Sequence, residues 1–204
     1  MVRLQLIDRG IRDDRVLEVM ASLPREAFVP VNYSAEAYAD RPLPIGMGQT
    51  ISQPYIVALM TEALDVNPDC DVLELGTGCG YQTAILAKLA RRIFTIDRIG
   101  QLTESAQAHL GRLDIDNVEY FVGDGSKGWP EDLCFDRIIV TAALPHIPQT
   151  LLDQMNANAI IVAPVGGEYS QDLMVHEKSG DEHRTRIVCP CRFVKLIGEH
   201  GFHE

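Results

Sequence analysis

Thr50 and Ser52 are two hydroxyl side chains separated only by Ile51, directly before a segment with helical spacing that begins near Gln53. A helix start can receive an anion such as a carboxylate, because its backbone N–H groups face the ligand alongside any hydroxyls. Ser52 can equally serve only as the N-cap of that helix, with Pro54 tolerated in its first turn. The spacing therefore predicts either a carboxylate-binding site or a simple helix cap.

A glycine-rich turn follows the apolar segment 72–75. This order predicts a buried strand, a tight turn and a helix N-terminus that faces a ligand. In a dinucleotide fingerprint the third glycine would fall at Tyr81, whereas here it is Gly80. The spacing is typical of methyltransferases that use S-adenosyl-L-methionine (SAM), although a purely structural turn is the alternative. We expect SAM to contact Glu74, Gly76, Thr77, Gly78 and Gly80.

Glu74 has a separate expected role within this group. Its carboxylate could attract the ammonium group of SAM, directly or through a water molecule. The expected turn itself needs glycines because larger side chains would keep the ligand away from the backbone.

Two acids follow the ends of later strands, where a doubly wound sheet binds its ligands. Asp97 ends the strand predicted at 92–96, and its carboxylate could accept hydrogen bonds from both ribose hydroxyls. Asp124 could accept from the adenine amino group, with Gly123 and Gly125 leaving room for the flat ring. A solvated acid and an ordinary Asp-Gly turn remain the simpler interpretations.

Small side chains follow the strand predicted at 135–140. Thr141 and Ala142 are expected beside the methyl donor, with Thr141 contacting SAM. Tight packing of the strand end explains the same residues equally well.

The order of apolar and polar segments alternates between helical and strand spacing. A proline- and glycine-rich connection is expected from Arg41 to Gly48. We expect helices over 12–21, 53–64, 82–89, 102–113 and 151–155. We expect strands over 72–75, 92–96, 118–122, 135–140, 159–163, 172–177 and 185–194.

These elements predict an α/β fold. Its centre is a doubly wound, mostly parallel, seven-stranded sheet of the SAM-dependent methyltransferase type, ending in an antiparallel C-terminal hairpin. We expect a single domain over 1–204, with 1–50 forming a helical cap over the ligand end of the sheet and 51–204 forming the core with a short C-terminal tail.

Composition narrows the class of substrate. The formal net charge is −11, and no cluster of Lys or Arg is present, so a nucleic-acid substrate would be repelled. No apolar stretch is long enough for a membrane span, and the start lacks a signal-peptide core, so we expect a cytoplasmic protein that acts without nucleic acid or membrane.

Cysteine and histidine give no reason to expect a metal. The five cysteines form no C-x-x-C pair, and disulfides are unexpected in this compartment. Cys189 and Cys191 lack third and fourth ligands nearby, while His200 and His203 fit a solvated tail.

Several segments together resemble the protein-L-isoaspartate O-methyltransferase family. The resemblance extends from about Ile11 to Leu196 and is most specific in Gly48–Tyr55, directly before the helix. It rests on residues 24–29, 43–46, 48–55, 72–82, 123–125, 140–143 and 164–166.

The resemblance implies transfer of a methyl group from SAM to the free α-carboxylate of L-isoaspartyl residues, leaving S-adenosyl-L-homocysteine. The ester then closes to a succinimide, whose hydrolysis begins repair of the damaged protein. In the family the serine matching Ser52 is the active-site residue, and we assign Thr50 a catalytic role beside it. The resemblance also implies that the segment Arg192–Leu196 lies near the substrate. We expect substrate binding by Ile51, Ala142, Arg192, Phe193 and Val194.

Three positions depart from the family pattern. Lys195 replaces a usual proline at the substrate rim, Cys79 replaces a serine of the glycine loop, and Asn158-Ala159 replace a common Gly-Gly pair. None of these changes removes a group that the chemistry requires.

The expected acceptor suits the residues present. A carboxylate is ionised at neutral pH and needs no general base, and the sequence offers none near the glycine loop. Two alternatives stay open: methyl transfer to another carboxylate or small-molecule acceptor, and a SAM-binding module without catalysis.

Overall fold

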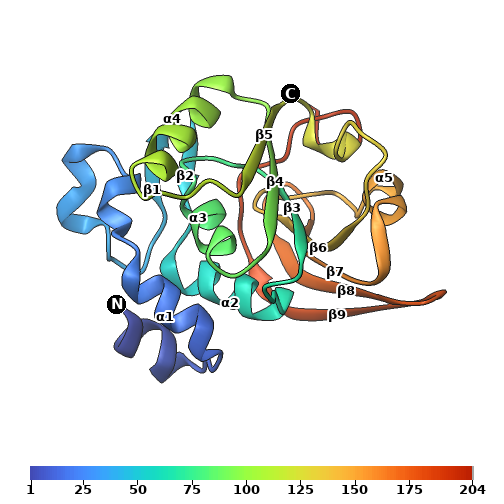
Figure 1. The fold of residues 1–204 in the computed structure, drawn as a ribbon, viewed down its shortest axis with the longest axis horizontal. Helices are drawn as coiled ribbons and strands as arrows, with labels where there is room; N and C mark the ends of the chain where they lie inside the picture. The colour runs from blue at the N-terminus through green and yellow to red at the C-terminus, as the bar shows by residue number, and fades with distance from the viewer. Residues whose placement is uncertain (204) are drawn as a thin grey trace.

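The computed structural model describes residues 1–203 and centres on one large sheet. Its strand order is β5-β4-β3-β6-β7-β8-β9 (Figure 1). The strands are β3 (Asp71–Leu75), β4 (Arg92–Asp97), β5 (Val118–Val122), β6 (Phe135–Val140), β7 (Met155–Gly166), β8 (Gln171–Ser179) and β9 (Glu182–Cys191). The seven-stranded sheet predicted from the sequence is therefore confirmed.

Strand direction divides the sheet into two parts. β5, β4, β3, β6 and β7 are parallel, whereas β8 runs antiparallel to both β7 and β9. β3 lies between β4 and β6, so the chain builds outward from it in both directions. This reversal of strand order is where a doubly wound sheet opens a ligand-binding crevice at its carboxyl ends.

Helices cover both faces of the sheet. The α-helices are α1 (Asp14–Ser22), α2 (Pro54–Leu64), α3 (Tyr81–Ala87), α4 (Gly100–Gly111) and α5 (Gln149–Asp153). Shorter helical segments are η1 (Val2–Leu6), η2 (Ile7–Arg9), η3 (Arg25–Phe28), η4 (Val31–Glu36) and η5 (Gly125–Lys127). Figure 1 shows α5 on the opposite side of the sheet from α2 and α3.

Two apolar cores result from the alternation of side chains along the buried strands. Every residue of β3 is buried, with Val72 facing the core shared with α1, α2 and α3. Leu73 faces the other core, where Trp129 and Leu151 pack. The first core also contains Leu6, so the N-terminal segment packs against the same face as the central helices.

The predicted connection at 41–48 is wrong in its local structure. It contains β1 (Leu43–Gly46), which pairs antiparallel with β2 (Gln49–Ile51) in a separate two-stranded sheet. The turn between them, Gly46–Gly48, has positive φ at all its residues, including Met47 at 51°. The segment therefore carries Thr50 on a strand that ends just before α2.

Most of the other predicted boundaries differ from the structure by a few residues, and the larger differences lie in the C-terminal half. The helix expected at 151–155 ends at Asp153, because Met155 already pairs with Phe135 as the first residue of β7. β7 is longer than expected and runs to Gly166. β9 ends at Cys191, so Phe193 and Val194 lie beyond the sheet.

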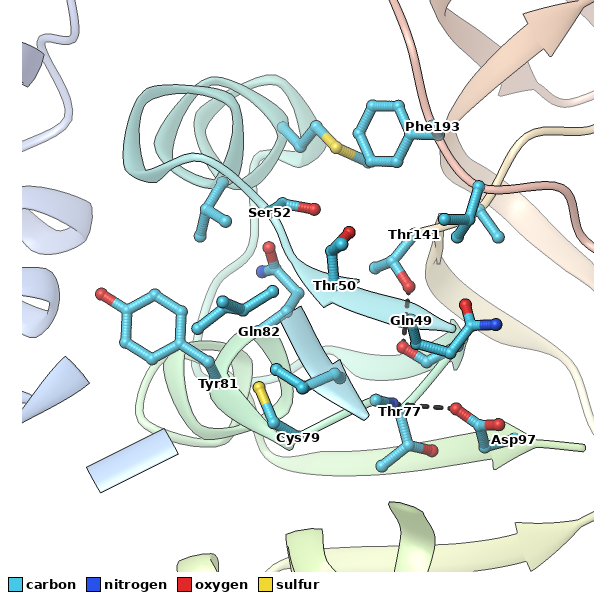
Figure 2. Close-up of a pocket in the computed structure, with 18 residues that line it drawn as sticks. Gln49, Thr50, Ser52, Thr77, Cys79, Tyr81, Gln82, Asp97, Thr141 and Phe193 are labelled. Carbon is cyan, nitrogen blue, oxygen red and sulfur yellow. Dashed lines mark hydrogen bonds between the residues drawn. The ribbon is translucent and has the colours of Figure 1, made fainter. Parts of the chain in front are cut away.

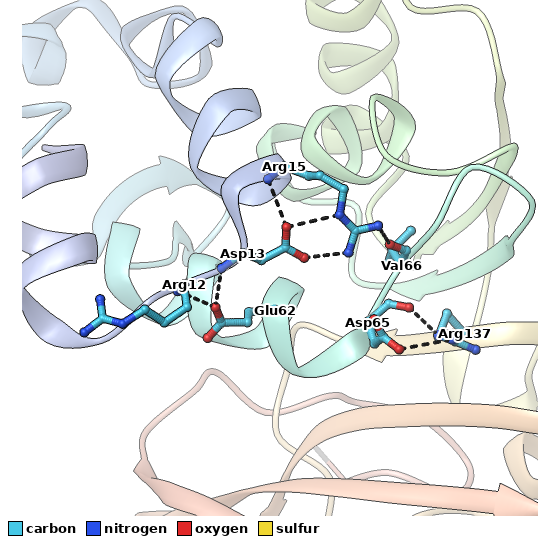
Figure 3. A network of polar contacts seen from close by, with 7 residues as sticks. All are labelled: Arg12, Asp13, Arg15, Glu62, Asp65, Val66 and Arg137. Carbon is cyan, nitrogen blue, oxygen red and sulfur yellow. Dashed lines mark hydrogen bonds and ion pairs between the residues drawn. The ribbon is translucent and has the colours of Figure 1, made fainter.

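A polar network joins the start of α1 to the end of α2 (Figure 3). Glu62 accepts hydrogen bonds from the backbone N–H groups of Arg12 at 2.6 Å and Asp13 at 2.8 Å. Asp13 caps α1 by accepting from the Arg15 N–H, and it also forms an ion pair with the Arg15 guanidinium. Arg15 reaches onward to the carbonyl of Val66 at 2.8 Å. The network orients α1 against α2.

Substitution Asp13→Ala should lower the free energy of unfolding by about 1 kcal/mol, because α1 loses its N-cap. Asp13→Asn keeps a capping oxygen and should lose less. The hydrogen bond from Arg15 lowers the pKa of Asp13, so the ion-pair contribution is present above pH ~4 and is lost as the pH falls through the lowered value. Urea unfolding at pH 7 and at pH 3 measures both effects; equal midpoints for the two variants at pH 7 would contradict the capping role.

Candidate active site

The glycine loop between β3 and α3 is shaped by two close approaches. A Cβ on Gly76 would lie 2.3 Å from Thr141 Oγ1, and one on Gly80 would lie 2.7 Å from Leu110 Cδ1. Both glycines also have positive φ, at 97° and 87°. The Thr141 hydroxyl donates to the carbonyl oxygen of Gly76 at 2.7 Å or to that of Leu75 at 3.0 Å. The ends of β3 and β6 are thereby held together at the switch point.

Asp97 joins this loop to the end of β4. One carboxylate oxygen accepts from the backbone N–H of Gly78 at 2.8 Å, and the other accepts from that of Ile99 at 2.9 Å. Each carboxylate oxygen has a further lone-pair site, so Asp97 can still accept from a ligand. Its side chain also lines the inner cleft defined below.

The inner cleft is the hollow enclosed by the glycine loop, the β1–β2 hairpin and the segment after β9, and it holds about 630 Å³. That volume includes the part of the hollow that is open to solvent. Figure 2 shows the Thr50 and Ser52 side chains directed into the same space as Thr141 and Phe193. The residues predicted from the sequence that line it are Thr50, Ile51, Ser52, Gly76, Thr77, Gly78, Asp97, Thr141, Ala142, Phe193 and Val194.

An outer cleft of about 1530 Å³ adjoins the inner one. We define it by Arg9 and Tyr55 on one side and residues 189–195 on the other. The predicted residue Arg192 lies here. The two clefts share five lining residues, which mark their junction: Thr50, Ser52, Thr141, Phe193 and Val194.

Ser52 is not the N-cap of α2. The helix begins at Pro54 with Gln53 as its N-cap, and no side chain caps it. Within residues 1–203, neither the Ser52 nor the Thr50 hydroxyl has a hydrogen-bond partner, and both line the two clefts. Both hydroxyls are therefore available to a ligand at the junction.

Arg25, which the sequence analysis did not single out, holds Ser52 from behind. Its side chain is completely buried, and its guanidinium donates to the carbonyls of Ser52 and Ala37, each at 2.7 Å. The guanidinium carbon lies 4.7 Å from the centre of the Tyr81 ring. Burial lowers the pKa of Arg25, and its Nη1 has no partner among the described residues. In the sequence, Arg25 stood out only as a member of the segment 24–29, which is one of the segments that resemble the family.

Glu74 does not reach the clefts, which does not support the expected contact with an ammonium group. It is completely buried, and one oxygen accepts from the hydroxyls of Thr83 at 2.6 Å and Thr95 at 2.7 Å. Its other oxygen has no partner in the part of the chain that the structure describes. Burial raises the pKa of Glu74 to about 8.

Asp124 and Gly80 also lie away from the inner cleft. Asp124 accepts from the N–H and hydroxyl of Ser126 and from the N–H of Glu199, so it fastens the C-terminal segment instead of facing a ligand. Gly80 begins α3 and packs against α4. Gly125, in contrast, lines a third hollow of about 500 Å³ together with Asp97. An adenine role for Asp124 therefore lacks support, whereas Gly125 is suitably placed.

Three titratable side chains line the inner cleft: Asp97, which is bound to two backbone N–H groups, and the buried Cys79 and Tyr81. Burial raises the pKa of Cys79 to about 11 and that of Tyr81 to about 12, so both are protonated at pH 7. Residues 1–203 contain no group of three or more His, Cys, Asp or Glu side chains that could hold a metal ion. Within the same range, no helix has the length and apolar character needed to span a bilayer.

Comparison with known proteins identifies the family. The family model described as protein-L-isoaspartate(D-aspartate) O-methyltransferase matches residues 2–201. A protein-L-isoaspartate O-methyltransferase of Methanoregula boonei is 51% identical over 204 residues, covering 100% of this chain and 94% of that protein. The chain belongs to this family.

Two solved structures share the fold of this chain. One isoaspartate methyltransferase superposes with a TM-score of 0.85 at 26% identity, covering 98% of this chain and 67% of that one. A Plasmodium falciparum structure, named as a protein-L-isoaspartate O-methyltransferase in complex with S-adenosyl-L-homocysteine, superposes with a TM-score of 0.82 at 24% identity. The alignment covers 96% of this chain and 96% of that one. The predicted family and fold are both confirmed.

The buried Glu74 predicts a pH dependence of stability. Its raised pKa means that between pH ~4.5 and pH ~8 the folded protein binds a proton that the unfolded chain has lost. Stability should therefore fall as the pH rises through this window. Glu74→Gln has the same shape without the titration and should flatten the slope. Urea unfolding midpoints at pH 5, 6.5 and 8 measure it; parallel profiles for the two proteins would contradict the assignment.

Proposed function

We propose that this protein transfers a methyl group from SAM to the α-carboxylate of L-isoaspartyl residues in damaged proteins and peptides. Membership of the family supports the activity. The observation that carries the proposal is the junction of the two clefts, where the unpaired hydroxyls of Thr50 and Ser52 line both spaces. An acceptor in the outer cleft can thus meet a ligand of the inner cleft at a junction that offers it these two hydroxyls.

The inner cleft fits SAM. A Cβ on Gly78 would project to 3.5 Å from Ile45, so its absence leaves room for a ligand between the loop and the hairpin. We assign cofactor contacts to the loop Gly76–Gly78, to Asp97 as acceptor for the ribose hydroxyls, and to Gly125 in the adjoining hollow. When bound, SAM supplies a methyl group activated by its sulfonium. Ala142 and Thr141 are small side chains that allow close approach at the junction.

We expect the acceptor to arrive as an anion, because none of the five residues that line the junction has a titratable side chain that could remove a proton. Cys79 and Tyr81 are held protonated by burial. A carboxylate has a reference pKa near 4 and is already ionised at neutral pH. The lining residues can then act by positioning the attacking oxygen and excluding water, which lowers the barrier without a base.

Ser52 and Thr50 are assigned to hold the acceptor carboxylate by donating hydrogen bonds. Arg25 is assigned a positioning role, because its bond to the Ser52 carbonyl fixes the backbone that carries the hydroxyl. The buried positive charge behind Ser52 also favours an anion in front of it. Ile51, Phe193 and Val194 would enclose the reacting groups in apolar surface.

The remaining assignments concern the protein as a whole. We propose one methyltransferase domain over 1–204, since buried residues of the N-terminal segment, beginning with Leu6, belong to the same apolar core as residues of the sheet. The free cysteines suit the cytoplasm, where thiols stay reduced. Isoaspartyl proteins are the proposed partners, and the net charge of −11 argues against nucleic acid.

A pair of peptides identical except for one residue tests the function. With labelled SAM, the L-isoaspartyl peptide should incorporate methyl groups and the L-aspartyl peptide should not, because only the former presents a free backbone α-carboxylate. Incorporation into both peptides, or into small carboxylic acids alone, would assign a different acceptor. Binding of SAM without turnover on any isoaspartyl peptide would indicate a non-catalytic module.

Ser52→Ala should lower kcat/KM for the isoaspartyl peptide by about tenfold to a hundredfold, the usual value of one hydrogen bond to a charged group. Affinity for S-adenosyl-L-homocysteine, measured by calorimetry, should stay nearly unchanged. Ser22→Ala removes a hydroxyl from the far end of α1 and serves as the control. Equal losses of turnover and cofactor affinity in Ser52→Ala would refute the assigned role.

A further inference from the structure

Lys195 lies on the wall of the outer cleft, close to the junction. Its backbone forms an isolated parallel bridge with Ala143, in which the Ala143 N–H donates to the Val194 carbonyl and the Leu196 N–H donates to the Ala143 carbonyl. These bonds use the backbone groups of the residues on either side of Lys195. A proline, usual here in the family, would therefore preserve the bridge, and a lysine adds a cation without disturbing it.

The ammonium group of Lys195 can change its ion-pair partner. Its Nζ lies 3.5 Å from Glu168 Oε1 and 5.9 Å from the centre of the Phe202 ring, with 36% of the Lys195 side chain and 51% of the Glu168 side chain exposed. Ion pairs this exposed are weak, because water screens them and ordering two long side chains costs entropy. A carboxylate on a ligand can thus replace Glu168 as the partner of Lys195.

The outer cleft differs in charge from the rest of the protein. Its lining contains three cations, Arg9, Arg192 and Lys195, against the single acid Glu168, although the whole chain has a net charge of −11. Arg9 is already committed, since it pairs with Asp40 and stacks on the Tyr55 ring at 3.6 Å. Arg192 is exposed and has no ion-pair partner among residues 1–203. Lys195 is therefore the cation of the outer cleft that can pair with an anionic ligand, and the charge of Arg192 adds to the attraction.

We propose that Lys195 makes this enzyme prefer isoaspartyl segments that carry a second carboxylate beside the damaged residue, with Glu168 acting as an internal competitor for the same ammonium. The inference rests on the proposed function and adds the class of acceptor. Ser52 would bind the acceptor anion at the junction, and Lys195 would bind the second carboxylate on the wall of the outer cleft.

Three isoaspartyl peptides test the preference, with Glu, Gln or Lys as the residue next to the isoaspartyl residue. The wild-type protein should show kcat/KM about fivefold higher for the Glu peptide than for the Gln peptide at low salt, with the Lys peptide lowest. The difference should shrink at ~0.5 M salt, where exposed charges are screened.

Two variants should move the Glu/Gln ratio in opposite directions. Lys195→Gln should bring it close to one, whereas Glu168→Gln should raise it above the wild-type ratio by freeing the ammonium group. Arg184→Gln is the matched control: it removes an exposed cation of β9 outside the cleft and should leave the ratio unchanged.

The outcomes separate this inference from the proposed function. Methylation of the Gln peptide without any charge preference, or the same shift in Lys195→Gln and Arg184→Gln, would overturn the role of Lys195 and leave the activity intact. Failure of the wild-type protein to methylate any of the three peptides would overturn both.

Discussion

The buried guanidinium of Arg25 is the interaction on which the arrangement of the junction depends. It binds the carbonyl of Ala37 in the N-terminal segment and that of Ser52 ahead of α2, and it lies over the ring of Tyr81 at the start of α3. Three stretches that are distant in sequence thus meet at one cation. Burying a charge without a carboxylate partner is costly, as the lowered pKa of Arg25 and its unpartnered Nη1 reflect. A neutral residue would avoid that cost but could not make both carbonyl bonds in a fork geometry.

The chemistry proposed for the junction follows both from the hydroxyl donors that line it and from the lack of a titratable side chain among its five residues. Hydroxyl donors and apolar side chains line the contact between the clefts, and the nearby Cys79 and Tyr81 stay protonated. Such a site can orient an anion but cannot create one. Acceptors that must first lose a proton are therefore disfavoured, and an abnormal backbone carboxylate is suited to it. The size of the outer cleft agrees with an acceptor that is part of a longer chain.

The sequence predicted the elements whose spacing is regular and the glycine loop that lines the inner cleft. The sheet, its C-terminal hairpin and the loop Gly76–Gly78 could be read in this way, because buried strands and glycine turns have strong local signals. The interpretation of Ser52 as the N-cap of α2 was wrong. Proline is favoured at the first helical position, so α2 starts at Pro54 and its N-cap is Gln53. Glu74 lies within β3 and Asp124 follows β5, yet the oxygens of Glu74 bind two threonines and those of Asp124 bind Ser126 and the C-terminal segment. Periodicity places a side chain on a strand but does not reveal which partner at long range it will find. The same limitation concealed Arg25, whose partners are 12 and 27 residues away.

On the wall of the outer cleft, the side chain proposed to set specificity is distinct from the side chains that line the junction. Residues 194–196 are held to Ala143 by main-chain bonds that the flanking residues supply, so the side chain at 195 can change without moving Val194 at the junction. Ser52 is fixed in a comparable way, since its carbonyl is bound by Arg25 while its hydroxyl remains free. In both places the backbone carries the structural bonds and leaves the side chain for the ligand. The side chain at the rim of the outer cleft can then vary while the reacting groups keep their positions, because separate main-chain contacts hold Ser52 and residues 194–196.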